Sequence, residues 1–541
     1  MENLVVTNNM IASIKKNLID SLTIASGAKS SATYYHNRDE QVKAVKENVV
    51  KLYKLSKELP LIVANQKGVT GTFISEVLLN EFKNTQKGGA CNIVNPIDWY
   101  DNGLSDKAIL SALHNLNEDG ITYVLRLFVN MKKEKINNER ARKISLGFLL
   151  SHPNIEFYSV KYRNKIAFVL KHIYGVKKTS ILLSIAKNFM NNNIFNNEKE
   201  VNIAKDLFLR YVNVDDEKAF KLLLFLFKED KDVRYLKRDF PIIYEYQKAR
   251  TDITGVSKVP KEVLIGLISD KNHPQYTELW STTAKRETTK AMLMKNVEVT
   301  SINQQVRETK ARTKLGVEKN VNLKKVTDFL ALYKTGYESG WTQELKDAIN
   351  DLAEKKKIPN FFYENIGIIL DDSNSMTGHK QESKNTPKAI ANFTARVLTK
   401  SAQNAVLVKA NDEVTDLATS FVKLLKDESS ENSYNAIFIL TDGYENSYEG
   451  LMNEVLETYF QATNRNIPVF QISPVTGAET GGNVRKLGSN VVTMAINNPV
   501  AIQPQINARL LEIDTSRWLE NQIHILEEAN VSRKVKNNIN V

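Results

Sequence analysis

The sequence contains almost no cysteine and no long apolar run. Cys91 is the single cysteine among 541 residues, so an intrachain disulfide and a cysteine-based zinc site are both excluded. This usage fits a reducing compartment, and we expect a cytoplasmic protein. No stretch of 18 or more residues is apolar, so no transmembrane helix is expected. Residues 1–18 show neither a continuous apolar segment nor a small-residue cleavage pattern, so we expect no signal peptide there.

Sequence motifs of several common enzyme classes are also missing. The chain contains no G-x-x-x-x-G-K-[ST] phosphate-binding loop, no H-E-x-x-H and no G-x-S-x-G. Its seven histidines are scattered, and His379, which lies near the candidate metal loop described below, does not by itself make a hydrolase. We therefore expect a protein without catalytic activity.

Positive charge is concentrated in the first two thirds of the chain. Residues 1–360 contain 58 Lys/Arg and 41 Asp/Glu, a net charge of +17, whereas residues 361–541 have a net charge of −5. A basic surface attracts polyanions, so the asymmetry favours nucleic acid or an anionic membrane as partner. Many soluble proteins have a basic domain without such a partner, and charge alone does not decide between the two.

Hydrophobic spacing predicts helices from about residue 11 to residue 352. In residues 105–118 the apolar side chains recur at i, i+3, i+4 and i+7, and a Glu-Asp-Gly turn separates this helix from the next. Further short helices follow after brief polar turns, and Gly175 ends one of them. Degenerate helix pairs in series are typical of a HEAT-like all-α repeat domain, although an irregular all-α domain would show the same pattern.

The pattern changes after Pro359, which closes a Lys-rich segment that we interpret as a linker. Short continuous apolar runs, which suit buried parallel strands, alternate there with helical spacing. The predicted strands are Ile366–Leu370, Ala405–Val408, Ala436–Leu440, Val469–Ile472 and Val491–Ile496. The predicted helices are Lys388–Ser401, Asp416–Leu425 and Tyr448–Gln461. The sequence therefore predicts a helical domain over residues 1–358 and, over residues 359–541, a Rossmann-like α/β domain with a parallel sheet and a C-terminal helical tail.

A metal-binding pattern follows the first predicted strand. Asp371, Ser373 and Ser375 form a D-x-S-x-S sequence where that strand ends. In open α/β sheets the ligand site lies at the carboxyl ends of the strands. One carboxylate and two hydroxyls on a tight loop supply three oxygen ligands, which a hard cation such as Mg²⁺ prefers. We expect a divalent-cation site here, and the alternative is a loop of the same fold that holds only water.

This pattern resembles the metal-ion-dependent adhesion site (MIDAS) of von Willebrand factor A-type (vWA) domains. A later strand ends in Thr-Asp-Gly, which resembles the sequence that supplies a second acidic residue in that family. The residues that match the family's metal site are Asp371, Ser373, Ser375, Thr415 and Asp442. Thr415 follows Glu413 and Val414, where the family usually has two glycines, and the short segment between Ser375 and Thr415 suggests a trimmed strand or hairpin.

A helical domain followed by a vWA domain resembles the Ro autoantigen, or TROVE, family. Leu330–Tyr337 and Ala348–Leu352 look like the last family helices before the vWA strand, Arg163–Gly175 looks like a helix in the middle of the ring, and Val259–Leu264 is a weaker match. In that family HEAT-like repeats close into a ring that binds small noncoding Y RNAs on its basic outer surface, and ends of misfolded RNAs enter the central hole. The resemblance implies an RNA-binding ribonucleoprotein with no catalytic activity.

Basic side chains of the middle helices are the candidate RNA contacts. Lys161, Lys165 and His172 lie off the apolar positions of their helix, so they can meet phosphates while the apolar face packs. Arg163 suits a forked phosphate contact better than a lysine would. A solvated helix face would show the same residues. The full candidate set is Arg140, Arg142, Lys143, Lys161, Arg163, Lys165, Lys171, His172, Lys177 and Lys178.

A protein-interaction scaffold is the alternative to RNA binding. An open coordination position on a metal at the MIDAS-like loop can accept an acidic side chain from a partner protein, and a helical solenoid can present further surfaces. Binding to a small noncoding RNA, with the ends of misfolded RNA as a further ligand, remains the leading interpretation. Neither function requires a membrane.

Overall fold

The structure is a computed structural model in which the described residues fall into two compact units. The described ranges are 38–55, 58–66, 68–83, 104–118, 120–192, 194–296, 328–358, 363–377, 386–410, 416–426, 433–445, 447–465, 467–474, 485–488 and 491–496, with the single residues 21, 25, 323, 361, 502 and 506. One unit comprises residues 78–86 and 116–322, and the other comprises residues 1–77, 87–115 and 323–541. Thr415, His379 and the predicted C-terminal tail lie outside the described residues.

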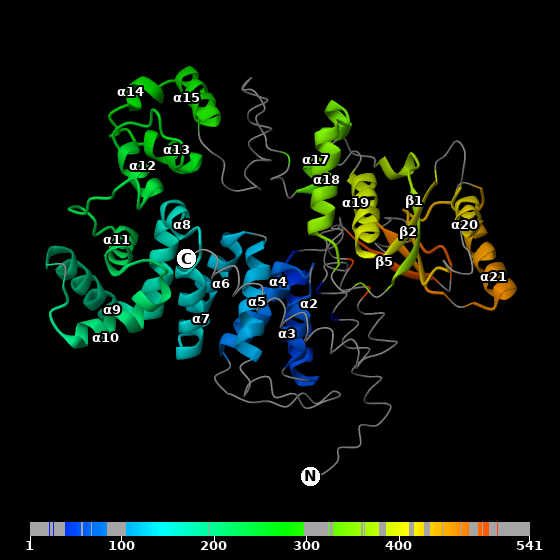
Figure 1. Ribbon diagram of the computed structural model, residues 1–541, viewed down its shortest axis with the longest axis horizontal. Coiled ribbons are helices and arrows are strands. Elements are labelled where there is room, and N and C mark those ends of the chain that lie inside the picture. The colour runs from blue at the N-terminus through cyan, green and yellow to red at the C-terminus, as the bar shows by residue number, and fades with distance from the viewer. Residues whose placement is uncertain are drawn as a thin grey trace, which may run out of the picture. The chain divides into compact units, whose positions relative to one another are not determined.

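The unit built around residues 116–322 is helical throughout its described part (Figure 1). Its α-helices are α6 (Ile121–Lys133), α7 (Glu139–Leu150), α8 (Ile155–Lys161), α9 (Arg163–Asn192), α10 (Glu198–Leu207), α11 (Asp216–Phe227), α12 (Pro241–Ala249), α13 (Lys261–Ile268), α14 (Tyr276–Leu279) and α15 (Thr283–Asn296). The longest helix, α9, packs against α6, α8, α10 and α11, and α8 packs on α12. The rings of Phe189 in α9 and Phe220 in α11 lie 5.1 Å apart. These contacts follow the apolar spacing that predicted the helices.

Gly175 interrupts α9, as the sequence predicts. Its φ of 75° and ψ of 163° are not helical, and an L-residue with a side chain rarely adopts a positive φ. The two halves of α9 therefore meet at a kink, and the predicted end of a helix at Gly175 is confirmed.

The second unit contains the sheet and several helices. Its helices are α2 (Arg38–Leu55), α3 (Leu59–Ala64), α17 (Phe329–Ser339), α18 (Gln343–Lys355), α19 (Thr386–Ser401), α20 (Leu417–Lys426) and α21 (Leu451–Thr463), while α4 (Gly71–Lys83) and α5 (Leu104–Glu118) begin in it. Its strands are β1 (Asn365–Asp371), β2 (Asn404–Ala410), β3 (Ala436–Leu440), β4 (Val469–Ser473) and β5 (Val491–Ala495). All neighbouring strands are parallel, in the order β2-β1-β3-β4-β5. Each predicted strand is confirmed within two residues, and no described strand precedes Asn365.

Helices cover both faces of this sheet. Side chains alternate along a strand, so Ile437 and Ile439 of β3 face α20 and α21, where Phe421 completes the same core. Phe438 points to the opposite face, and its ring stacks on Phe470 of β4 at 4.9 Å. On the side away from α20 and α21, α19 lies against β1 and β2 (Figure 1). The parallel α/β architecture predicted from the sequence is therefore confirmed.

The two helices before the sheet pack on α19. The rings of Phe329 in α17 and Phe393 in α19 stack at 4.8 Å. The guanidinium of Arg396 in α19 donates hydrogen bonds to the Tyr333 hydroxyl (3.2 Å) and to Asn350 Oδ1 in α18 (2.7 Å). Residues 329–355 thus belong to the compact unit of the sheet, whereas the sequence groups them with the helical domain. The domain boundary at residue 358 and the closed ring stay predictions.

No helix in the described part of the chain is long and apolar enough to cross a membrane.

Candidate metal centre and nucleic-acid interface

The candidate metal residues lie where the strand order of the sheet reverses. The next strand in the chain, β2, lies on one side of β1, and the following strand, β3, lies on the other side. The order of the strands therefore reverses at β1. Ligands of open α/β sheets bind in the crevice at such a switch point. Asp371 is the last residue of β1, and Thr441 and Asp442 directly follow β3. The sheet therefore brings two segments that are 70 residues apart in sequence to one edge.

The carboxylate of Asp371 is the centre of this group. It is 3% exposed. Its Oδ1 accepts a hydrogen bond from the Ser373 amide at 3.0 Å, and its Oδ2 accepts one from the Thr441 hydroxyl at 2.6 Å. Burial raises the pKa of Asp371, the hydrogen bonds from Ser373 and Thr441 lower it, and the nearby Asp442 carboxylate raises it again. A cation at this position would favour the ionised carboxylate.

The hydroxyls of the loop complete the set of oxygen atoms. Ser373 Oγ and Ser375 Oγ lie 2.9 Å apart, and Ser373 is 5% exposed. Asp442 is 7% exposed, and its Oδ1 accepts the Tyr444 amide at 3.1 Å. Over the described residues no three carboxylate, imidazole or thiolate groups lie together, so a cation here would depend on the serine hydroxyls. Two buried carboxylates and two hydroxyls suit a hard cation such as Mg²⁺.

A glycine fixes the turn that carries Asp442. Gly443 has a φ of 86°, and a Cβ built on it would lie 2.5 Å from the Arg485 carbonyl oxygen. Gln471 of β4, which is fully buried, holds the facing segment, because its Nε2 donates to that carbonyl at 2.6 Å and its Oε1 accepts the Leu487 amide at 3.0 Å. Sequence reasoning missed Gln471, which is the one polar residue within an otherwise apolar predicted strand.

The neighbouring Asp372 points away from this group. Its Oδ1 lies 3.0 Å from Lys388 Nζ, which also donates to the Asp372 carbonyl at 2.8 Å, and its Oδ2 lies 3.8 Å from Lys409 Nζ. These contacts tie the loop to α19 and β2. Of the predicted metal residues, the structure gathers Asp371, Ser373, Ser375 and Asp442, while Thr415 lies outside the described residues.

Several of the predicted RNA contacts are held inside the helical unit. Arg163 is 14% exposed, donates to the Phe225 carbonyl (2.6 Å) and pairs with Asp230 (2.9 Å). Arg140 lies 3.7 Å from the fully buried Glu81 carboxylate, and the His172 ring lies 2.8 Å from the Ile136 carbonyl. These side chains stabilise packing between helices. Burial raises the pKa of Tyr174 well above its ordinary value, and the charge of the half-buried Arg142 opposes that rise.

Two predicted lysines have acidic partners. Lys143 pairs with Glu139 at 2.6 Å, and Lys161 lies 3.7 Å from Glu262. The remaining four predicted cations are exposed and form no ion pair with any described residue. They are Lys165, Lys171, Lys177 and Lys178.

An exposed aromatic ring lies among these lysines. Phe168 of α9 is 39% exposed, and Lys132 Nζ lies 4.1 Å from its ring centroid. Lys165 and Lys171 are three residues to either side of it, on the same exposed flank of the helix. We call Lys132, Lys165, Phe168 and Lys171 the α9 face. Sequence reasoning missed Phe168, although its position off the apolar spacing of the helix would have shown it.

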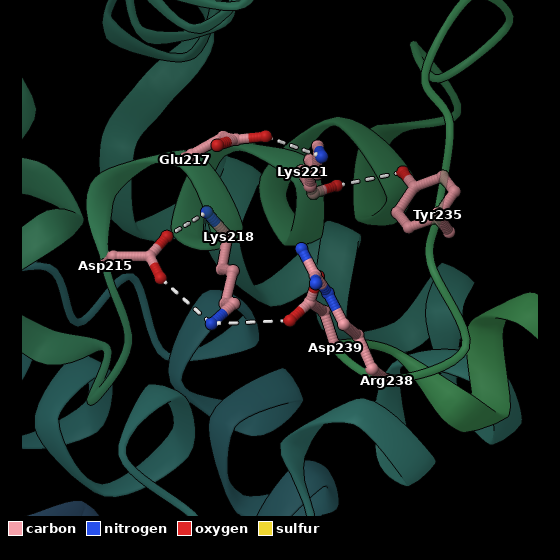
Figure 2. Close-up of polar contacts among 7 residues, drawn as sticks. All are labelled: Asp215, Glu217, Lys218, Lys221, Tyr235, Arg238 and Asp239. Atoms are coloured by element: carbon pink, nitrogen blue, oxygen red, sulfur yellow. Dashed lines mark hydrogen bonds and ion pairs between the residues drawn. The ribbon is translucent and has the colours of Figure 1, made fainter.

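A contrasting region surrounds α11, where every basic side chain shown in Figure 2 has an acidic neighbour. Lys218 Nζ lies 3.0 Å from Asp215 and 3.5 Å from Asp239, and Lys221 pairs with Glu217 at 2.7 Å. The Tyr235 hydroxyl donates to the Lys221 carbonyl at 3.0 Å, which fastens the following segment to the helix. Since the charges of these residues compensate one another, Lys218 and Lys221 attract a polyanion less than the lysines of the α9 face do.

The chain is similar to a Ro protein. It matches the crystal structure of the Deinococcus radiodurans Ro (RSR) protein at 12% sequence identity, over 91% of this chain and 99% of that one, with a TM-score of 0.41. No protein-family model matches the sequence, and a search of curated proteins finds no match.

Proposed function

We propose that the protein binds structured RNA through the basic surface of its helical unit. The observation that carries the proposal is the α9 face, where exposed lysines that have no acidic partner among the described residues flank an exposed phenylalanine ring. Lysines attract the phosphate backbone, and an aromatic ring stacks on an unpaired base. The net charge of +17 over residues 1–360 adds long-range attraction.

The resemblance of the sequence to the Ro family indicates which RNA we propose as the ligand. It is a small noncoding RNA of the Y type, with the single-stranded ends of misfolded RNAs as further ligands. The protein would act as a binding partner in a ribonucleoprotein of the cytoplasm, without catalytic chemistry of its own.

A filter-binding titration at two salt concentrations tests this function. The protein should bind a hairpin RNA at low salt, and log K should fall against log[salt] with a slope of roughly −0.7 to −0.9 per phosphate contact. A hairpin with a 3′ tail should bind more tightly than the blunt hairpin if the ends of RNA are recognised. Absence of binding to either RNA at low salt would refute RNA binding, and equal binding of both would remove the preference for ends.

We also propose a divalent cation, Mg²⁺ in the first place, at Asp371, Ser373, Ser375 and Asp442. The support is the grouping of two buried carboxylates and two hydroxyls at the switch point of the sheet. This group favours a second function, in which an acidic side chain of a partner protein completes the coordination of the metal. If the protein captures a carboxylate-bearing partner and a chelator releases that partner, the result would support this second function. Capture that a chelator does not affect would count against it.

A further inference from the structure

A cavity of 380 Å³ lies in the helical unit where α8 gives way to α9. Lys161, Tyr162, Arg163 and Lys165 line one side of it, Lys228 lines a second side from the end of α11, and Tyr246 lines a third from α12. Residues of α13 also line the cavity, which is open to solvent. Every residue of this cavity lies in one compact unit.

The charge of the cavity is positive and only partly compensated. Arg163 pairs with Asp230, and Lys161 lies near Glu262. Lys165 and Lys228 are exposed and have no ion-pair partner in the described part of the chain. Two uncompensated ammonium groups at one cavity favour an anionic ligand, and phosphate is the anion that lysine commonly binds.

Lys228 is held in an unusual backbone conformation. It ends α11 with a φ of 62° and a ψ of 30°, which is the left-handed region. Glycine or asparagine is usual at such a helix end, because a larger side chain is disfavoured there. A lysine at this position gives up backbone stability while placing an ammonium group at the cavity.

No described residue of the chain would obstruct a side chain at Gly266. It lies inside α13 at an ordinary helical φ, and a Cβ built on it would meet nothing within 4 Å. Glycine weakens a helix relative to alanine. Because Gly266 lines the cavity, its missing side chain keeps the space open.

The size and the rings of the cavity indicate an organic phosphate. The volume of 380 Å³ is far larger than an inorganic phosphate needs and lies within the range of roughly 300–1,000 Å³ that is usual for small-molecule sites. Tyr246 is anchored at a right angle to Phe225, with centroids 5.7 Å apart, and Tyr162 supplies a second ring. Tyrosine rings stack on nucleobases.

We propose that this cavity binds one nucleotide, with its phosphate at Lys165 and Lys228 and its base at Tyr162 and Tyr246. The nucleotide is either a free nucleoside monophosphate or a residue of a bound RNA strand. The proposal goes beyond RNA binding by the α9 face, and the two can fail separately.

Calorimetry with AMP, GMP, CMP and UMP on the full chain tests the proposal. If the cavity takes a free nucleotide, at least one of them should bind, and the matching nucleoside, which lacks the phosphate, should bind at least about tenfold more weakly. Gly266→Leu should fill the cavity and weaken binding by a similar factor. Lys228→Gly should also weaken it while raising the thermal midpoint, because glycine is relaxed in the left-handed region. Lys178→Gly is the control for Lys228→Gly, because it removes the same charge from an exposed lysine outside the cavity. It should leave nucleotide binding unchanged.

The two sources of the nucleotide are separated with a short single-stranded RNA. If free nucleotides bind and both cavity variants weaken them, the ligand is a free monophosphate. If only the RNA binds and both cavity variants weaken it, the ligand is a residue of the strand. If neither ligand responds to Gly266→Leu and Lys228→Gly while thermal melts show folded protein, the cavity proposal is overturned and RNA binding by the α9 face still stands.

Discussion

At the scale of single residues, the Asp371 carboxylate is the charged group on which a metal at the switch point depends most. It lies at the end of β1, where it is buried and accepts hydrogen bonds from Ser373 and from Thr441, which follows β3. Asp371→Ala should abolish binding of Mg²⁺ or Mn²⁺ in calorimetry. Asp372→Ala is the matched control, because Asp372 faces Lys388 and Lys409 instead, and it should retain binding. Equal metal affinity in the wild type and Asp371→Ala would show that the metal does not bind at Asp371.

The imidazole of His152 should make the stability of the protein depend on pH. Asn154 N–H donates to Nδ1 at 3.0 Å, and Nε2 lies 3.2 Å from Asn117 Nδ2. Burial lowers the pKa of His152 below its usual 6.5. The unfolded chain therefore takes up a proton first, so stability is full above pH 6.5 and falls as pH drops through and below that value. An imidazolium also cannot accept from Asn154.

Urea denaturation at pH 7.5 and 5.5 measures this dependence. The free energy of unfolding of the wild type should fall at the lower pH, and His152→Gln should flatten that fall. A His152→Gln variant with the same loss as the wild type would show that another group is responsible.

At the scale of elements, close packing between β1 and α20 depends on a glycine. A Cβ built on Gly367 would lie 2.5 Å from Leu424 Cδ2 of α20. Gly367→Val should therefore lower the free energy of unfolding by about 1–3 kcal/mol through overpacking. Gly266→Ala, where a Cβ has open space, is the control and should raise it by about 0.5–1 kcal/mol. Denaturant titrations that show no loss for Gly367→Val would contradict the packing described here.

The sheet was predictable from local sequence, because each strand is a short apolar run. β3 coincides with the predicted Ala436–Leu440, and the position of Asp371 at a strand end follows from the same pattern. Partners distant in sequence were not predictable. Arg163 pairs with Asp230, 67 residues away, so an arginine that seemed available for phosphate instead joins two helices. Spacing shows which side chains leave the apolar face of a helix, but not what they meet.

At the scale of the whole molecule, charge is the property that links the sequence to the proposed function. The excess of positive charge lies before residue 361. Lys218 and Lys221 of α11 are compensated by neighbouring carboxylates, as Figure 2 shows, whereas the lysines of the α9 face are exposed and have no acidic partner among the described residues. Net charge is therefore a weaker guide to the proposed RNA-binding surface than the position of the basic side chains that lack acidic partners in the described part of the chain.

The most direct measurement is RNA affinity after a local reversal of charge. Lys132→Glu/Lys171→Glu changes the α9 face without touching the cavity, and Lys423→Glu/Lys426→Glu makes the same change of charge on exposed residues of α20. Both variants should remain folded in thermal melts. In filter binding to a hairpin RNA at low salt, the first pair should weaken affinity at least about tenfold and reduce the salt slope, while the second pair should have little effect. Equal affinity in the wild type and both variants would contradict RNA binding by the α9 face.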